Sequence, residues 1–254
     1  MSKIEVSFTP ENYQVYENRD SIVVVTDVLR ATSAICTALH NGATEIIPVS
    51  TIEEARQYME QGFLVGAERN GEKIPEFNFG NSPFDYMSDE ITNKPVVLTT
   101  TNGTRAINMA AESFQVIVGA FTNISAVVNY IADHSDKDVL VLCSGWKGRY
   151  NLEDTLFAGA LTYELNQKGV LSEIEDSALS AMYLYNLAKD DPYKFLMNSS
   201  HRRRLKKLNL KEDVRYCLRT DFTDIVPILK EGKLVPSNGK SELPQIRFAK
   251  QGAA

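Results

Sequence analysis

The sequence contains few cysteines and no long hydrophobic run. Its 254 residues include only three cysteines, Cys36, Cys143 and Cys217, which lie far apart in the chain. Their odd number and wide spacing argue against a disulfide framework and fit a reducing compartment. No apolar segment approaches the roughly 20 residues that a membrane-spanning helix needs, and residues 1–13 lack the apolar core of a signal peptide. We therefore expect a cytoplasmic protein with no membrane partner.

Several ligand-binding signatures are also absent. No Walker loop and no glycine-rich dinucleotide fingerprint follows a predicted strand, so neither common nucleotide-binding motif is indicated. The three histidines, His40, His134 and His201, do not show metal-ligand spacing. We assign them no role.

The sequence contains fewer basic residues than acidic ones. The chain has 27 Lys and Arg against 33 Asp and Glu, a formal net charge of −6 and a pI of about 5.2. A broad nucleic-acid surface is therefore not expected. The basic run "HRRRLKK" (201–207) lacks interleaved aromatic residues, and we interpret it as a solvated helix face rather than a binding segment. A small anionic ligand would require donors that are clustered locally.

The sequence does contain regular alternation of apolar strands and amphipathic helices. This pattern predicts right-handed crossovers and a largely parallel or mixed sheet covered on both faces, with a helical C-terminal region after Gly169 and a closing strand pair or extended tail at 224–236. We expect one unit over 1–254, or alternatively two closely packed α/β lobes of about 1–125 and 126–254. Strands are predicted within 21–26, 44–50, 63–71, 95–100, 115–121 and 138–146, and helices within 31–40, 51–62, 103–112, 124–135 and 152–168.

Polar clusters follow four of the predicted strands. Ligands of open α/β sheets bind beyond the carboxyl ends of the strands, where these clusters should lie together. A helix cap explains each cluster singly, but the set indicates an anion-binding site. The clusters are "TDVLRATS" (26–33), "GAERNG" (66–71), "TTTNGT" (99–104) and "CSGWKGRYNLED" (143–154).

Four carboxylates are available at this edge: Asp27, Glu68, Glu153 and Asp154. A phosphate site with Mg²⁺ requires one or two of them. Asp27 is a candidate for metal binding, for attack on phosphorus, or for capping the next helix. Glu68 with Arg69 is alternatively a surface ion pair, and Glu153 and Asp154 suit the first turn of any helix.

Donors for an anion are present in the same loops. Arg30, Thr32 and Ser33 precede or begin a helix, whose dipole favours a negative charge. The second donor group is either a phosphate cradle or an N-cap with additional threonines. It comprises Thr100, Thr101, Asn102, Gly103 and Thr104.

Cys143 and Arg149 have the spacing found in the loop of cysteine-dependent phosphatases, with five residues between them. In that loop the arginine binds phosphate and lowers the thiol pKa, so that the thiolate attacks phosphorus. The alternative is a small buried residue that ends a strand.

Taken together, these motifs resemble the 2-phosphosulfolactate phosphatase family over nearly the whole chain. The resemblance includes "GNSP" (80–83), "LCSGWKGRYNLEDTLFAGA" (142–160) and the C-terminal stretch 199–227. It implies a three-layer α/β/α fold and a Mg²⁺-dependent phosphatase that converts 2-phosphosulfolactate to 3-sulfolactate, a step towards coenzyme M. Our hypothesis for the mechanism gives catalytic roles to Asp27, Arg30, Cys143 and Arg149, and Mg²⁺ binding to some of the four carboxylates. It assigns substrate binding to the donors above together with Arg69, Asn81, Ser82, Ser144 and Gly145.

Three questions stay open at this point. The first is the nucleophile, which is water, Asp27 or Cys143. The cations available to the substrate are Arg30, Arg69, Arg105, Lys147 and Arg149. The alternative functions are a phosphatase of the same fold for another small anionic phosphate ester, and a non-catalytic anion-binding protein. A pure anion binder would gain nothing from adjacent carboxylates, which favours the enzyme. A homodimer is the default expectation, because homo-oligomers are common.

Overall fold

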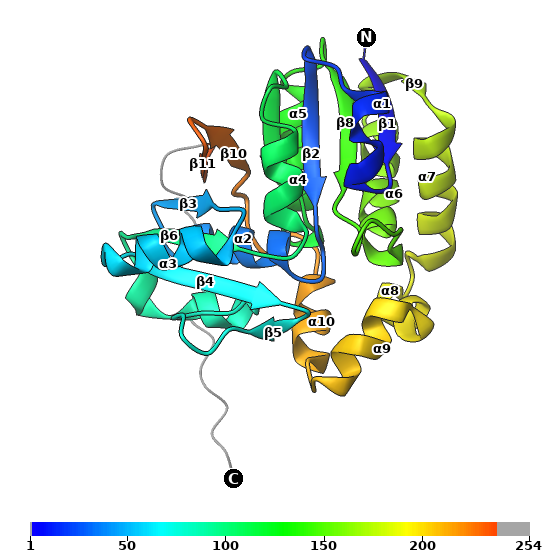
Figure 1. Cartoon of the computed structure of the whole chain (residues 1–254). Helices are drawn as coiled ribbons and strands as arrows, with labels where there is room; N and C mark the ends of the chain where they lie inside the picture. Colours follow the sequence, from blue (N-terminus) through cyan, green and yellow to red (C-terminus); the bar gives the residue numbers. More distant parts are fainter. Residues whose placement is uncertain (1, 238–254) are drawn as a thin grey trace.

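The protein is an α/β protein in which strands and helices alternate over most of the chain (Figure 1). The structure is a computed structural model and describes residues 2–237. Its strands are β1 (Ser2–Ser7), β2 (Ser21–Thr26), β3 (Glu45–Pro48), β4 (Leu64–Arg69), β5 (Glu72–Lys73), β6 (Pro95–Thr99), β7 (Gln115–Val118), β8 (Asp138–Cys143), β9 (Leu171–Ile174), β10 (Pro227–Lys230) and β11 (Lys233–Pro236). Its α-helices are α1 (Tyr13–Tyr16), α2 (Ala31–His40), α3 (Ile52–Glu60), α4 (Gly103–Met109), α5 (Ile124–Ala132), α6 (Leu152–Gln167), α7 (Asp176–Ala188), α8 (Pro192–Phe195), α9 (Ser200–Lys207) and α10 (Lys211–Cys217).

Within residues 2–237, 11 strands form one mixed sheet in the order β5-β4-β6-β3-β11-β10-β7-β2-β8-β1-β9. Strands β7, β2, β8, β1 and β9 are parallel neighbours, and so are β4, β6 and β3. The antiparallel hairpin β10–β11 joins the two groups. The predicted α/β class is confirmed. The closing strand pair also exists, and it lies inside the sheet as the link between its two parallel groups.

The central strand β2 explains why the chain forms three layers. All six of its residues are buried, as expected for a strand covered on both faces. Ile22 and Val24 belong to an apolar cluster with residues of α5, α6 and α7, whereas Val23 and Val25 belong to a second cluster with residues of α2 and α4. Burying each such side chain contributes roughly 1.5–3 kcal/mol. Strand alternation therefore directs apolar side chains to helices on both faces of the sheet.

The predicted elements agree with the observed ones at most boundaries. β2 spans the predicted 21–26, and α2 spans the predicted 31–40. The Thr51 side chain accepts a hydrogen bond from the Glu54 amide and caps α3 as predicted. β1 and β9 were not predicted, and they pair with each other at one edge of the sheet.

The two parallel strand groups point towards a common region. In Figure 1 the arrowheads of β4 and β2 converge from different directions, and α8, α9 and α10 lie beneath the end of β2. β1 lies between β8 and β9, and the β10–β11 hairpin lies between β3 and β7, so strands from before and after residue 125 are interleaved in the sheet. The division into two lobes at that position stays a prediction.

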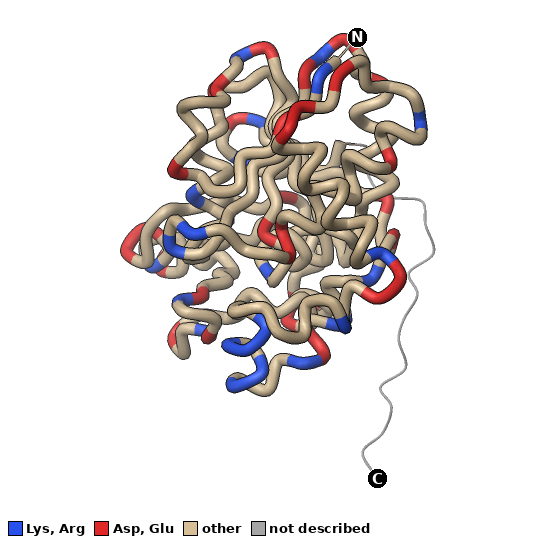
Figure 2. The backbone as a smooth tube through the Cα atoms, turned by 90° about the vertical axis from the view of Figure 1, so that its right-hand side faces the viewer, with Lys and Arg blue, Asp and Glu red and all other residues tan. Residues whose placement is uncertain are grey.

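Charge is spread over most of the surface, with one basic stretch. Figure 2 shows acidic and basic residues dispersed along the tube, and a basic run at the lower end of the molecule, at the height of α9 in Figure 1. Over residues 2–237, no helix has both the length and the apolar character required to cross a membrane.

Candidate active site

The loop after β2 presents Asp27 at the region where the strands converge. The Asp27 amide donates to Thr32 Oγ1 (3.1 Å), and the Thr32 amide donates to the Asp27 carbonyl (3.0 Å). Ser33 Oγ donates to the Val28 carbonyl (3.0 Å). The loop therefore uses the Thr32 and Ser33 hydroxyls for its own backbone, and both residues are fully buried. Among the described residues no group donates a hydrogen bond to the Asp27 carboxylate.

The loop after β6 packs directly against Asp27. A Cβ atom on Gly103 would lie 2.9 Å from Ala31 Cβ and 3.1 Å from Asp27 Oδ2, so only glycine fits this contact. Thr100 and Thr104 brace the turn reciprocally: the Thr104 amide donates to Thr100 Oγ1 (3.2 Å), and the Thr104 hydroxyl donates to the Thr100 carbonyl (3.3 Å). Of the predicted cradle, only Thr101 and Asn102 line the cavity described below.

The third loop, after β4, provides Glu68. Its carboxylate accepts hydrogen bonds from Thr101 Oγ1 (3.2 Å) and from the Gly71 amide, with a longer contact to Asn81 Nδ2 (3.4 Å). Arg69 is directed away from this carboxylate, because it donates to the Glu68 carbonyl (2.6 Å) and to Thr99 Oγ1 (3.0 Å). Partial burial lowers the pKa of Arg69. Arg69 thus braces the loop that positions Glu68.

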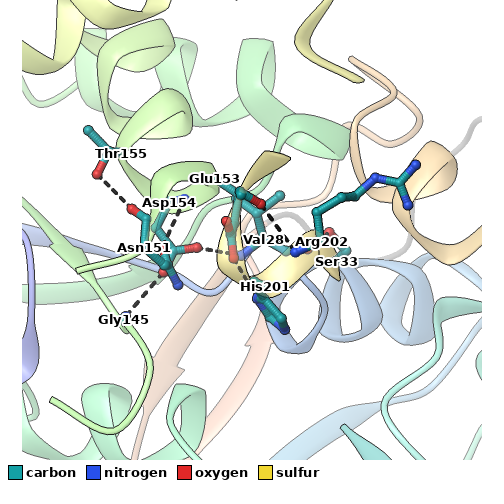
Figure 3. A network of polar contacts seen from close by, with 10 residues as sticks. Val28, Ser33, Gly145, Asn151, Glu153, Asp154, Thr155, His201 and Arg202 are labelled. Carbon is teal, nitrogen blue, oxygen red and sulfur yellow. Dashed lines mark hydrogen bonds and ion pairs between the residues drawn. The ribbon is translucent and has the colours of Figure 1, made fainter. Parts of the chain in front are cut away.

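The start of α6 connects two of these loops (Figure 3). Asp154 Oδ1 accepts from the Val28 amide (2.9 Å), and Oδ2 accepts from the Gly145 amide (3.2 Å). Asn151 caps the helix by accepting from the Asp154 amide (3.2 Å). Both Asp154 oxygens are therefore committed to backbone amides, which makes this residue a structural link between the loops after β2 and β8.

Glu153 has a different environment, although it is the next residue in the chain. One of its carboxylate oxygens forms a hydrogen bond with His201 Nδ1 of α9 (2.5 Å), and the other is buried without a partner among the described residues (Figure 3). Only 1% of Glu153 is exposed. An unpaired carboxylate oxygen at this depth is costly unless a ligand or cation meets it.

Burial and mutual repulsion change the proton affinity of these acids. Burial raises the pKa of Asp27 to about 7, with smaller increases from Glu68 and Glu153 and decreases from His201 and Arg30. Burial, followed by Asp27 and Glu153, also raises the pKa of Asp154 far above its ordinary value. Such a concentration of buried carboxylates is typical of a functional site or of a cation site.

The loops enclose a small cavity, here called the inner chamber. It has a volume of about 20 Å³, room for roughly one water molecule or ion. Asp27, Glu68, Thr101 and Asn102 line it from the strand ends. The remaining wall comes from Leu29, Arg30, Gly71, Asn81, Trp146, His201 and Leu205.

A wider cavity of about 400 Å³, the outer chamber, adjoins the inner one. The two share Arg30, Gly71 and Asn81 as a common wall. The outer chamber is further lined by Ser82 and Lys73, and by Leu208 and Leu210 between α9 and α10, with Glu72, Gly80 and Asp85 completing it. Of the two residues predicted to bind substrate, Asn81 therefore lies in the shared wall and Ser82 lines the outer chamber alone.

Arg30 is fixed in the shared wall by two buried contacts. Its Nη1 donates to Asp213 Oδ2 of α10 (2.8 Å), and Nη2 donates to the Gly71 carbonyl (2.5 Å). Both partners of the ion pair are almost fully buried, with exposed side-chain fractions of 4% and 8%. Removing one partner of such a pair costs about 3–5 kcal/mol.

Cys143 does not have the environment of a nucleophilic thiol. It is fully buried, and burial together with Asp154 and Glu153 raises the pKa of its thiol far above the ordinary value. Arg149 is exposed and pairs through its backbone with Trp146. Ser144 is buried, and Gly145 has a positive φ of 58°. Within the described chain neither residue lines either chamber, nor do Cys143 and Arg149.

We expect Cys143→Ala to keep kcat/KM within about twofold of wild type, because a protonated, buried thiol does not attack phosphorus. Cys36→Ala is the matched control, since Cys36 is equally buried but lies in α2. Steady-state phosphate release at pH 7 provides the measurement. A loss of about a thousandfold confined to Cys143→Ala would restore the thiol as nucleophile.

Helix α9 contributes side chains that the sequence interpretation missed. His201 and Leu205 line the inner chamber, and Arg204 stacks on Trp146 with its guanidinium carbon 3.9 Å from the ring centroid. The interpretation of 201–207 as a solvated face, and of His201 as a residue without a role, was therefore wrong for this side of the helix. The signal was available in the helical spacing of His201, Leu205 and Leu208.

Known proteins resemble this chain in sequence over most of its length. A family model described as 2-phosphosulpholactate phosphatase matches residues 7–232. A protein of Caldanaerobacter subterraneus subsp. tengcongensis is 41% identical over 231 residues, covering 88% of this chain and 95% of that protein. A Thermotoga maritima protein is 42% identical over 212 residues (84% and 90%), and a Clostridium novyi protein is 37% identical over 228 residues (89% and 96%). All three are named "Probable 2-phosphosulfolactate phosphatase".

Proposed function

Because the chain belongs to the 2-phosphosulpholactate phosphatase family, we propose that it is a Mg²⁺-dependent phosphatase that hydrolyses 2-phosphosulfolactate to 3-sulfolactate and phosphate. The observation that carries this proposal is the inner chamber, where Asp27 and Glu68 lie beside a buried arginine. Carboxylates next to a cationic donor suit a bound cation and a phosphoryl group, whereas an anion-binding protein would place no carboxylates there.

The side chains present fit a Mg²⁺ ion. The Asp27 carboxylate has no donor among the described residues, and repulsion from Glu68 and Glu153 contributes to its raised pKa. A bound cation would relieve both conditions. No group of three or more potential ligands with metal-binding geometry exists among residues 2–237. This agrees with Mg²⁺, which usually takes one or two carboxylates and completes its shell with water and phosphate oxygens.

We assign Asp27 and Glu68 as the residues that hold the ion, because both line the inner chamber. Glu153 and Asp154 have supporting roles: Glu153 pairs with His201, and Asp154 ties together the backbones of two loops. When bound, Mg²⁺ would neutralise charge on the phosphoryl group and on the attacking and leaving oxygens.

The protein's own groups would orient the ester and exclude bulk water. Arg30 places its guanidinium in the wall between the two chambers, and Asn102 provides a side-chain amide in the inner chamber, where the Thr101 hydroxyl already donates to Glu68. The Asn102 amide would stabilise negative charge that develops on the phosphoryl oxygens. Trp146, Leu205 and Leu29 form the apolar part of the wall. We assign the attack to a water molecule, with Asp27 as its neighbour.

A substrate panel tests this proposal against a phosphatase for another small phosphate ester. Purified protein with Mg²⁺ is assayed for phosphate release from 2-phosphosulfolactate, 2-phospholactate, 3-phosphoglycerate and 4-nitrophenyl phosphate. We expect kcat/KM to be largest for 2-phosphosulfolactate, by about tenfold or more. A larger value for a different ester would keep the phosphatase and replace the substrate. Binding without turnover of every ester would support the anion-binding alternative.

A further inference from the structure

Arg30 has one buried donor that the protein itself does not use. Two of its guanidinium nitrogens bind Asp213 and Gly71, but Nε has no hydrogen-bond partner among the described residues. Only 4% of the residue is exposed. A buried N–H without an acceptor is unfavourable. In a cavity wall it indicates a ligand that supplies the acceptor.

The position of Arg30 between the two chambers indicates which part of the ligand supplies this acceptor. The inner chamber, at about 20 Å³, holds an ion or a water molecule but no organic group, whereas the outer chamber has about 400 Å³. A small ester must therefore keep its carbon skeleton and its second anion in the outer chamber. Its phosphoryl group then points inward, towards Asp27 and Glu68.

The outer chamber is lined by further polar side chains, some of them free to donate a hydrogen bond and others already bonded within the protein. Ser82 Oγ has no hydrogen bond among residues 2–237, and Asn81 adds an amide. Lys73 Nζ donates to the Asn78 carbonyl (2.6 Å), and Asp85 accepts from the Gly80 amide (2.8 Å), while the exposed Glu72 adds a second carboxylate. Lys73, Asp85 and Glu72 together carry one net negative charge at the rim, and Arg30 is the buried cation of this wall.

We propose that Arg30 Nε, with Ser82 and Asn81, binds the sulfonate of the substrate in the outer chamber, and that Asp213 is the positioning residue that holds the guanidinium for this contact. The proposal rests on the proposed function and names the subsite for the sulfonate, one of the substrate's two non-reacting anions. A sulfonate suits these donors because its three oxygens diverge and can accept from separate loops. A planar carboxylate would instead favour the paired nitrogens of the arginine fork, which Asp213 and Gly71 already occupy.

The test compares kcat/KM for 2-phosphosulfolactate with that for 2-phospholactate, which lacks only the sulfonate, and for malate 2-phosphate, which carries a carboxylate in its place. Arg30→Lys keeps the charge but removes Nε. We expect its preference for 2-phosphosulfolactate over 2-phospholactate to fall by about 10- to 100-fold, the usual effect of one hydrogen bond to a charged group. Arg215→Lys, an exposed position on α10, is the matched control and should keep the wild-type ratio.

Two further variants, Ser82→Ala and Asp213→Asn, separate a loss of sulfonate recognition from a loss of folding. Ser82→Ala leaves the buried ion pair intact and should reduce the same ratio by about two- to tenfold. Asp213→Asn should raise KM for 2-phosphosulfolactate with little change in kcat, and should affect 2-phospholactate much less, while Glu212→Gln changes neither. Circular dichroism confirms that each variant is folded.

Equal losses on both esters in Arg30→Lys would overturn the proposal, because Arg30 would then serve the phosphoryl group. A wild-type enzyme that prefers malate 2-phosphate would assign the subsite to a carboxylate and also overturn it. If no ester is hydrolysed, the proposed function fails, and thermal shift then tests the subsite alone. 3-Sulfolactate should stabilise wild type more than lactate does and lose this advantage in Arg30→Lys; equal shifts would contradict the subsite.

Discussion

Asp27→Asn is expected to lower kcat/KM for phosphate release by about a thousandfold or more, the scale seen when a central catalytic carboxylate is removed. Asp27 lines the inner chamber, its carboxylate receives no hydrogen bond from the described residues, and it lies against the loop that contains Gly103. Asparagine keeps the size of the side chain but removes the charge that would bind the cation. Steady-state kinetics measure the loss, and Asp133→Asn, at an exposed position after α5, is the control.

The same variant should be at least as stable as wild type in the metal-free state. The raised pKa means that folded Asp27 binds a proton more tightly than the unfolded chain does. Its contribution to stability is therefore complete below the ordinary pKa of about 3.9 and is lost as the pH rises through about 7. Asparagine does not titrate, so metal-free Asp27→Asn should lose less stability than wild type between pH 4 and 8. A variant that is inactive because it is unfolded would instead be less stable than metal-free wild type in thermal melts.

Removal of divalent metal is expected to reduce activity by about a hundredfold or more, and excess Mg²⁺ should restore it. The reason is the electrostatics around the inner chamber, where burial and neighbouring carboxylates raise the pKa values of Asp27 and Asp154 in the absence of a cation. Protein dialysed against EDTA is assayed before and after Mg²⁺ is added.

Binding of Mn²⁺, followed by water-proton relaxation, provides a readout that does not depend on turnover. Wild type should bind the ion, Asp27→Asn and Glu68→Gln should bind it weakly, and Glu90→Gln, at an exposed position outside both chambers, should bind it normally. Full activity after complete removal of metal would exclude the Mg²⁺ assignment and leave the loop donors of the inner chamber to stabilise the phosphoryl charge.

Much of the fold was predictable from local pattern. Within Ser21–Thr26 the four residues Ile22 to Val25 are continuously apolar and flanked by polar residues, a pattern that predicts a buried strand. β9 was missed because it is short and its two central residues are exposed. β1 was missed because its apolar residues Ile4 and Val6 alternate with the charged Lys3 and Glu5 and form no continuous run. The position of the β10–β11 hairpin inside the sheet depends on long-range pairing with β7 and β3, which no local pattern encodes.

The strand-end rule predicted part of the site. Asp27, Glu68, Thr101 and Asn102 follow three different strands, and the structure brings them to one cavity. The rule could not distinguish side chains that face the cavity from those that hold the loops. Thr32, Ser33, Thr100 and Thr104 all follow strands, but their hydroxyls bond within their own loops.

The other side of the site comes from the C-terminal helices, whose position relative to the sheet was not predicted from the sequence. Asp213 binds Arg30 across 183 residues of chain, and His201 reaches Glu153 across 48. Helical spacing indicates which side of α9 is buried but not against what. The spacing of Cys143 and Arg149 misled for a related reason, since burial of a thiol depends on tertiary packing and not on the distance to an arginine along the chain.

The most direct test of the account is a time course of 2-phosphosulfolactate with the purified wild-type protein and Mg²⁺, followed by ³¹P NMR for phosphate and by mass spectrometry for the organic product. The account predicts that phosphate and 3-sulfolactate appear in equal amounts, and that Asp27→Asn produces neither above background. An unchanged substrate signal with folded wild-type protein and bound metal would contradict the proposed activity.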